Sequence, residues 1–191
     1  MRKIDEQKKQ AIEHTVLVII KEEGIQGLSF GKIAKRARVS SGAPYVYFKD
    51  KTDMLSSLYL KAKNLFDQGI QYDIDQGKTL QEKIFFSVNH FARMAVDYPL
   101  EANLLNALRD NPKMISEEAR IEGSSLAFPL VSMYEEAVKD NRFVSDNLEL
   151  IYAQLFGPFI MLLVDRQAVG KFATIEELNE IIKMSVKGVL R

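Results

Sequence analysis

The sequence predicts an all-α protein with a small N-terminal three-helix head and a larger C-terminal helical bundle. Apolar residues recur at helical spacing along most of the chain, and no segment alternates convincingly as a strand would. Polar capping residues precede several of these stretches, and Gly or Pro ends or interrupts them. Because 47% of the 191 residues are hydrophobic, the chain can build a substantial core in one or two domains.

Short local signals delimit the first helices. A helix is expected over about residues 4–23, and Gly24 and Gly27 end it. Ser29 can cap a second helix, which ends near residues 37–39.

The third helix is expected to begin near Ser40. Pro44 lies within its first turn, so regular helical geometry starts only near Ala43. A fourth helix follows over about residues 50–72, and the loop at 73–78 is the first that could mark a domain boundary.

The rest of the chain also reads as helices. They are expected at residues 80–96, 98–108, 116–139 and 146–166, with a last helix that begins after Thr174. Pro129 lies inside the third of these stretches, so we predict a kink or break near Ala127.

The longest apolar stretch covers residues 150–164. It is shorter than the roughly 20 residues of a membrane span, and Gly157 and Pro158 interrupt it. We interpret it as a helix buried on most sides and expect no membrane partner.

The net charge of zero hides an asymmetry along the chain. Residues 1–64 contain 13 Lys and Arg against 7 Asp and Glu, whereas residues 65–191 contain 13 against 19. A basic N-terminal third is typical of a chain that meets a polyanion at one end. A chance imbalance of solvated charges is the alternative.

Residues 28–53 have the layout of a helix-turn-helix, whose second helix enters the DNA major groove. Pro44 and Phe48 lie four residues apart, so they can anchor this helix against the preceding one. Lys51 falls in the first turn of the next helix, where backbone N–H groups favour a phosphate. The predicted DNA contacts are Ser29, Ser41, Gly42, Ala43, Tyr45, Val46, Tyr47 and Lys51. A basic flank is expected from Lys32, Lys35, Arg36 and Arg38.

The same segment resembles the tetracycline-repressor (TetR) family of bacterial regulators. The matching positions are Leu28-Ser29, Ile33-Ala34, Ala37, Val39-Ser40, Tyr45, Tyr47-Phe48 and Lys51. The resemblance covers about 45 residues. It implies a three-helix DNA-binding head, a larger helical body, a dimer and a small-molecule effector. We accordingly expect a DNA-binding domain over residues 1–50 and an effector-binding and dimerisation domain over residues 51–191.

The segment departs from the family pattern in two ways. Arg38 stands where relatives usually have glycine, which predicts a different or strained end to the second helix. Gly31, Ala43 and Val46 occupy positions where relatives often have polar base readers, and they cannot form bidentate hydrogen bonds with bases. Phosphate contacts should therefore supply much of the affinity, with sequence read through methyl groups, tyrosines and DNA shape.

Enzyme chemistry finds little support. The chain has no cysteine, and its two histidines, His14 and His90, lie on different predicted helices. We see no glycine-rich phosphate loop and no cluster with metal-ligand spacing. No catalytic residue, metal or cofactor is therefore predicted. The absence of cysteine and of an apolar leader fits a cytoplasmic protein.

Aromatic and methionine residues are dense in the body, which core packing must largely explain. Some of them can instead line a largely apolar cavity with a few polar groups. The predicted effector-binding residues are Phe85, Asn89, His90 and Tyr134.

The stretch at 146–166 has two neighbouring apolar stripes, and a single chain offers limited cover for both. Pairing with the last helix across a two-fold axis would bury the second stripe in a four-helix interface. The predicted interface residues are Leu155, Phe156, Phe159, Leu163, Leu178, Ile182 and Val189. Complete burial within one chain is the alternative.

Together these features predict a homodimeric, cytoplasmic, ligand-responsive transcription regulator. It is expected to act as a repressor on near-palindromic double-stranded DNA and to be released by a small molecule. The alternative is a DNA-binding adaptor whose body binds a partner protein and no small molecule.

Overall fold

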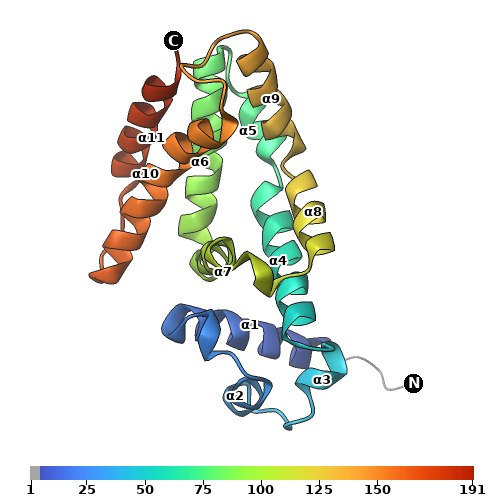
Figure 1. The fold of residues 1–191 in the computed structure, drawn as a ribbon. Helices are drawn as coiled ribbons and strands as arrows, with labels where there is room; N and C mark the ends of the chain where they lie inside the picture. Colours follow the sequence, from blue (N-terminus) through green and yellow to red (C-terminus); the bar gives the residue numbers. More distant parts are fainter. Residues whose placement is uncertain (1–4) are drawn as a thin grey trace. The chain divides into compact units, whose positions relative to one another are not determined.

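The computed structural model describes residues 5–191, and helices account for most of that range (Figure 1). In chain order they are α1 (Glu6–Glu23), α2 (Phe30–Arg36), α3 (Pro44–Tyr47), α4 (Lys51–Asp67), α5 (Ile70–Asp75), α6 (Leu80–Asp97), α7 (Pro99–Asp110), α8 (Glu117–Ser125), α9 (Phe128–Lys139), α10 (Leu148–Ala168) and α11 (Ile175–Val189). Within residues 5–191 the only β pairing is an isolated bridge, so the all-α prediction is confirmed. The predicted helical start at Ile4 lies outside the described residues.

The helices form two compact units. The first contains residues up to Phe66 together with Tyr98–Leu126, and the second contains Asp67–Asp97 and Ala127–Arg191. This division by packing is not the functional division at residue 50, which stays a prediction.

The first unit contains α1 to α4, α7 and α8. Helix α1 packs against α2, α3 and α7. Its apolar side chains are fully buried at Ile12, Val16 and Ile19, the spacing seen in the sequence. Gly24 ends α1 with a φ of +73°, a conformation that glycine adopts without strain.

The end of α2 contains the strain predicted from the sequence. Arg38 adopts the left-handed conformation, with a φ of +56°. The N–H of Val39 donates to the carbonyl of Ala34 at 3.0 Å, and the N–H of Arg38 donates to that of Lys35 at 3.3 Å. These two bonds form a Schellman cap, which glycine usually completes. The chain thus keeps the usual turn geometry with an arginine in the strained position.

Two breaks separate helices that periodicity alone would join. The sequence predicts a fourth helix that reaches Tyr72, but α4 ends at Asp67. Gly69, with a φ of +84°, then turns the chain before α5. The break predicted at Ala127 is confirmed, because α8 ends at Ser125 and Pro129 lies in the first turn of α9.

The second unit is built around α6. Helices α10 and α11 pack against each other and against α6, and α9 contacts α5 and α10 (Figure 1). The chain end is fastened within this unit, because Val144 donates to the carbonyl of Val189 at 2.9 Å and Arg191 donates to that of Arg142 at 3.0 Å. Helix α11 begins with the predicted cap at Thr174, where Thr174 and Glu177 form a capping box.

Helix α10 corrects one prediction. It runs without interruption for 21 residues, through Gly157 and Pro158. By length and composition it is the one helix in residues 5–191 that could cross a membrane, although such a helix also occurs in the core of soluble proteins. Only 17% of the residues in the most apolar stretch of α10 are buried inside the chain. The prediction that this helix is buried on most sides is therefore wrong for the single chain.

Candidate nucleic-acid interface and effector cavity

The recognition surface is formed by the short helix α3 and the turn before it. Tyr45 and Val46 have 65% and 56% of their surface exposed, which makes them prominent apolar groups on the first unit. The Tyr45 ring packs edge-on against Phe30, with ring centroids 4.7 Å apart. Phe30 therefore holds Tyr45 in place while leaving its outer face open.

Ala43 and Pro44 lie on the inner side of α3. The predicted start near Ser40 is corrected, because α3 begins at Pro44, the first-turn position that proline favours. Ala43 is only 5% exposed and belongs to the same core cluster as Ile33 and Phe48. The packing of α3 on α2 therefore covers most of the Ala43 side chain, and its contact with the groove stays a prediction.

Tyr47 is half-buried and has a partner. Its hydroxyl donates to the backbone carbonyl of Asp5 at 3.1 Å, which links α3 to the start of α1. Between these segments lies a hollow of about 240 Å³, lined by Asp5, Lys8, Ser40, Gly42, Ala43, Val46 and Tyr47. Tyr47 thus positions the recognition surface as well as lying at its edge.

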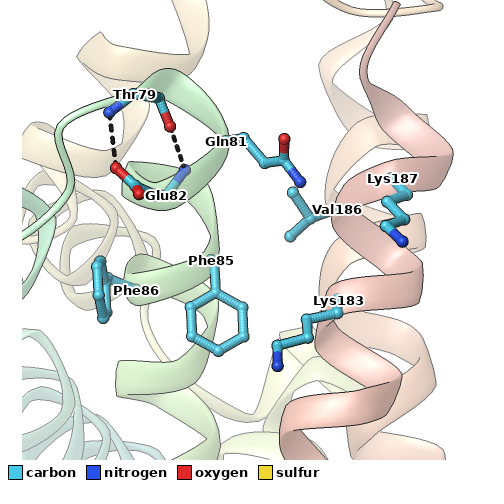
Figure 2. Close-up of a pocket in the computed structure, with 8 residues that line it drawn as sticks. All are labelled: Thr79, Gln81, Glu82, Phe85, Phe86, Lys183, Val186 and Lys187. Carbon is cyan, nitrogen blue, oxygen red and sulfur yellow. Dashed lines mark hydrogen bonds between the residues drawn. The ribbon is translucent and has the colours of Figure 1, made fainter.

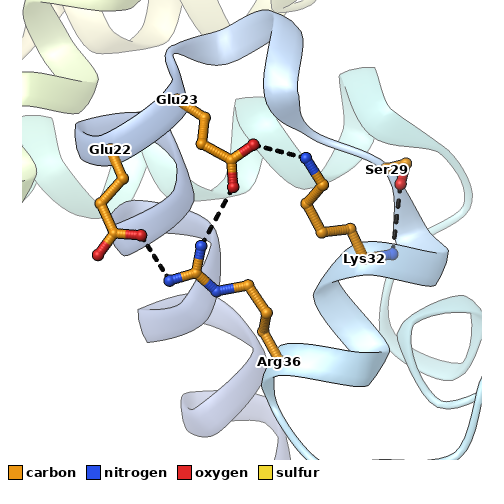
Figure 3. A network of polar contacts seen from close by, with 5 residues as sticks. All are labelled: Glu22, Glu23, Ser29, Lys32 and Arg36. Carbon is orange, nitrogen blue, oxygen red and sulfur yellow. Dashed lines mark hydrogen bonds and ion pairs between the residues drawn. The ribbon is translucent and has the colours of Figure 1, made fainter.

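The basic flank is smaller than the sequence indicates (Figure 3). Lys32 donates to Glu23 at 2.6 Å, and Arg36 contacts Glu22 at 2.6 Å and Glu23 at 3.2 Å. The hydrogen bond from Lys32 is the main reason that the pKa of Glu23 falls below its ordinary value, so Glu23 stays ionised near neutral pH. Figure 3 also shows Ser29 at the start of α2, where its hydroxyl accepts from the N–H of Lys32 at 3.3 Å.

Lys35 and Arg38 are exposed. Neither forms an ion pair with any residue from 5 to 191. They are therefore the members of the predicted flank best able to meet phosphates.

The start of α4 combines cations with a strong cap. Asp50 accepts from the N–H of Asp53 at 2.9 Å, and Asp53 accepts from the N–H of Lys49 at 2.9 Å. Lys49 is exposed and Lys51 is half-buried at the first helical position. In sequence the two lysines thus flank Asp50, whose carboxylate accepts a hydrogen bond from a backbone N–H group in the first turn of α4.

The predicted effector residues lie in the second unit, and three of them are engaged in side-chain hydrogen bonds. Asn89 donates to Asn179 at 2.7 Å. His90 Nδ1 lies 2.6 Å from a carboxylate oxygen of Asp73. The fully buried Tyr134 contacts the Ser87 hydroxyl at 3.2 Å, and its burial strongly raises its pKa.

The fourth predicted effector residue, Phe85, borders a cavity of about 500 Å³ (Figure 2). The lining comes from α6, the residue before it and α11, and consists of Thr79, Gln81, Glu82, Phe85, Phe86, Lys183, Val186 and Lys187. This volume is in the range of small-molecule sites. Asn89, His90 and Tyr134 are not part of the lining, so the structure does not bring the four predicted residues to one site.

The predicted interface residues are corrected by their burial. Five of them are buried inside the second unit, namely Leu155, Phe159, Leu178, Ile182 and Val189. Phe156 and Leu163 are partly buried against the same cluster. The physical reason is packing, because these side chains belong to the core cluster that α10 and α11 share with α6.

A different apolar face remains exposed, which we call the α10–α11 face. On α10 it consists of Leu150, Ala153, Gly157, Met161 and Val164, and on α11 of Met184 and Gly188. The α10 members recur at intervals of three and four residues, so they share one side of the helix. Gly188 lies beside Gln154 of α10, because an added Cβ would be 3.4 Å from the Gln154 side chain.

Sequence reasoning missed Phe30, Asp5 and Lys8 at the recognition surface. Phe30 directly follows the Ser29 cap, and an aromatic residue at the start of α2 could have indicated a packing partner for Tyr45. Asp5 lies 42 residues from Tyr47, and no local pattern links them. Within residues 5–191 no group of three His, Cys, Asp or Glu residues could hold a metal ion.

Comparison with known proteins gives consistent results for the head and for the fold. Residues 17–58 match the family model of bacterial regulatory proteins, tetR family. The fatty acid metabolism regulator protein of Bacillus subtilis is 36% identical over 83 residues, which are 43% of this chain and 43% of that protein. The regulator AcrR of Shigella flexneri is 35% identical over 65 residues, which are 34% of this chain and 30% of that protein. The chain thus spans less than half the length of these curated relatives.

The fold is similar over the whole chain to that of a solved TetR-family transcription regulator from Marinobacter aquaeolei. The TM-score is 0.82 at 21% identity, and the alignment covers 100% of this chain and 99% of that one. The head is therefore similar in sequence and the body in fold.

Proposed function

The chain belongs to the TetR family of bacterial regulatory proteins, and on that premise we propose that it is a homodimeric, ligand-responsive transcriptional repressor. One observation carries the proposal. The head presents Tyr45 and Val46 to solvent on a helix that is anchored by the buried Pro44 and Phe48. Tyr45 and Val46 lie on a firmly packed helix, and their apolar surface is better accommodated in the major groove of DNA than in solvent.

Phosphate contacts then hold the head on the duplex. The exposed Lys35, Arg38 and Lys49, together with Lys51, surround this pair in the sequence. Val46 offers a methyl contact to thymine and Tyr45 offers a hydroxyl to bases or phosphates, but neither forms a bidentate pair. Binding should accordingly depend steeply on salt, with part of the specificity coming from DNA shape.

Dimerisation is proposed through the α10–α11 face. A charge-free stripe with Met161 at 67% exposure and Val164 at 51% is costly to leave in water. Gly157, whose Cβ position meets nothing within 4 Å in this chain, would let a second helix approach closely. Two heads held by such a pairing would read a near-palindromic operator.

Release by a small molecule completes the proposal. The protein has one arrangement of the heads that fits DNA and another that does not. A ligand can release the repressor from DNA only if it has a higher affinity for the second arrangement than for the first. The cavity beside Phe85 is the best candidate for its site. A repressor of this kind acts in the cytoplasm, where it meets DNA.

Gel retardation tests the proposal. The probe is the DNA upstream of this chain's own gene, and the variants are Tyr45→Ala and Lys51→Ala, with Tyr72→Ala as the control because Tyr72 is equally exposed on α5. We expect the first two to weaken retention about tenfold or more and the control to match the wild type. Equal retention by all four proteins would refute the docking surface.

A further inference from the structure

We propose that the cavity between α6 and α11 binds a singly charged organic acid with a flat aromatic body, whose carboxylate lies between Lys183 and Lys187. The inference rests on the proposed function only for the effect of binding on DNA, because the binding itself can be measured without DNA. It depends on three properties of the lining shown in Figure 2.

The first property is that the two aromatic rings lie on one wall and the two ammonium groups on the other. Phe85 and Phe86 come from α6, and their rings are 5.6 Å apart at 71° to each other. The two lysines come from the facing helix α11, with Val186 between them in sequence. An amphipathic ligand can therefore place its apolar part on α6 and its charged part toward α11.

The second property is an unsatisfied pair of positive charges. Lys183 and Lys187 are one helical turn apart, so they share one face of α11 and repel each other. Neither makes an ion pair with a residue in the described part of the chain. Lys183 instead lies 6.0 Å from the centre of the Phe85 ring, at the limit of a cation–π contact. A carboxylate between the two ammonium groups would relieve their repulsion.

The third property is the net charge of the lining. Glu82 is the acidic residue of the cavity, and its carboxylate accepts from the N–H groups of Lys78 at 2.8 Å and Thr79 at 3.0 Å. These bonds lower the pKa of Glu82, so it stays ionised while committed to the cap of α6. Two ammonium groups and one carboxylate leave a charge of +1, which matches a monoanion better than a dianion.

An aromatic body fits the apolar wall. Edge-to-face packing is the preferred arrangement of aromatic rings, and the two phenylalanine rings already adopt it with each other. A flat ring can pack against Phe85 in the same way, while the amide of Gln81 at the rim can donate to the acid group. The cavity volume of about 500 Å³ is ample for a fused two-ring acid.

The experiment uses three probes of one shape in isothermal titration of the full chain at pH 7. They are 2-naphthoate, the neutral 2-naphthamide and the cationic 2-naphthylmethylamine. We expect 2-naphthoate to bind about tenfold more tightly than the amide and the amine to bind most weakly. Lys183→Gln and Lys187→Gln should each weaken naphthoate binding about threefold, and the double variant about tenfold.

Lys171→Gln is the matched control, because Lys171 is an exposed lysine outside the cavity. It should leave naphthoate binding unchanged, and Phe85→Leu should weaken naphthoate and naphthamide alike. Equal affinity for the three probes, no binding of 2-naphthoate, or equal effects of the Lys171 and Lys183 variants would each overturn the proposal. Circular dichroism of each variant confirms that it is folded.

A separate arm distinguishes this inference from the proposed function. If 2-naphthoate binds as expected but operator DNA stays bound, the site stands and release through this site fails. If the protein does not retain DNA at all, the proposed function fails while the titration still tests the site.

Discussion

Replacing Arg38 with glycine should stabilise the head and weaken its grip on DNA. Arg38 has a φ of +56° in the Schellman cap of α2, and an L-residue in this conformation costs about 1–2 kcal/mol. Glycine removes that strain, but it also has more freedom in the unfolded chain, which offsets about 0.5–1 kcal/mol. The net gain for Arg38→Gly is therefore about 0.5–1 kcal/mol in the free energy of unfolding.

The matched control is Lys35→Gly. It removes one exposed cation from α2 and introduces the same residue, but at a helical position, where glycine costs about 1 kcal/mol. In thermal unfolding, Arg38→Gly should raise Tm by about 1–4 °C and Lys35→Gly should lower it by a similar amount. Both should make the slope of log K for DNA binding against log salt concentration shallower by about 1 per lost phosphate contact.

The opposite signs of the two stability changes are the decisive feature. A lower Tm for Arg38→Gly would mean that the cap is not strained, or that the arginine side chain makes a stabilising contact that outweighs the strain. An unchanged salt slope for both variants would show that α2 lies away from the phosphates.

The remaining predictions concern packing, pH and assembly. Gly123→Ala should lower the free energy of unfolding by about 1–3 kcal/mol, because an added Cβ would clash with the Tyr59 ring. Urea unfolding measures this change. The stability of the head should fall as the pH drops below about 4.5. The ion pair with Lys32 lowers the pKa of Glu23, and this pair stabilises the head only while Glu23 is ionised. Glu23→Gln should flatten this dependence in unfolding curves from about pH 6 to 3.5. Met161→Glu should convert the proposed dimer to a folded monomer in light scattering, because it places a charge on the α10–α11 face.

The packing and assembly predictions each have a matched control in the chain. Gly31→Ala should leave the free energy of unfolding unchanged or raise it, because an added Cβ at this α2 position meets nothing within 4 Å. Ile121→Glu changes an equally exposed apolar residue on α8 and should leave the oligomeric state unchanged. If Ile121→Glu disrupts the dimer and Met161→Glu does not, the α10–α11 face is not the interface.

Local signals explain which parts of the fold were predictable. The end of α1 at Gly24, the cap at Ser29 and the capping box at Thr174 depend on residues within one turn of each other, and all are present. The break between α4 and α5 was missed because Phe66 and Ile70 keep helical spacing across Gly69, although the backbone turns there.

The site depended on tertiary geometry that spacing does not encode. Helical periodicity identifies an apolar stripe but not which neighbour covers it, so it cannot show that Leu155 and Ile182 are buried in the core of the second unit. In the same way, composition counts Lys32 and Arg36 as free cations, whereas Glu22 and Glu23 from α1 neutralise them. Charge pairing between helices has no signature along the chain.

The salt dependence of operator binding is the sharpest test of a head held on DNA by phosphate contacts. If Lys35, Arg38, Lys49 and Lys51 contact phosphates in each of two subunits, about eight phosphates are neutralised. A plot of log K against log salt concentration should then have a slope of about −7, and affinity should fall by about four orders of magnitude between 50 and 200 mM salt. A slope shallower than about −2 would contradict a dimer held on DNA by these four cations.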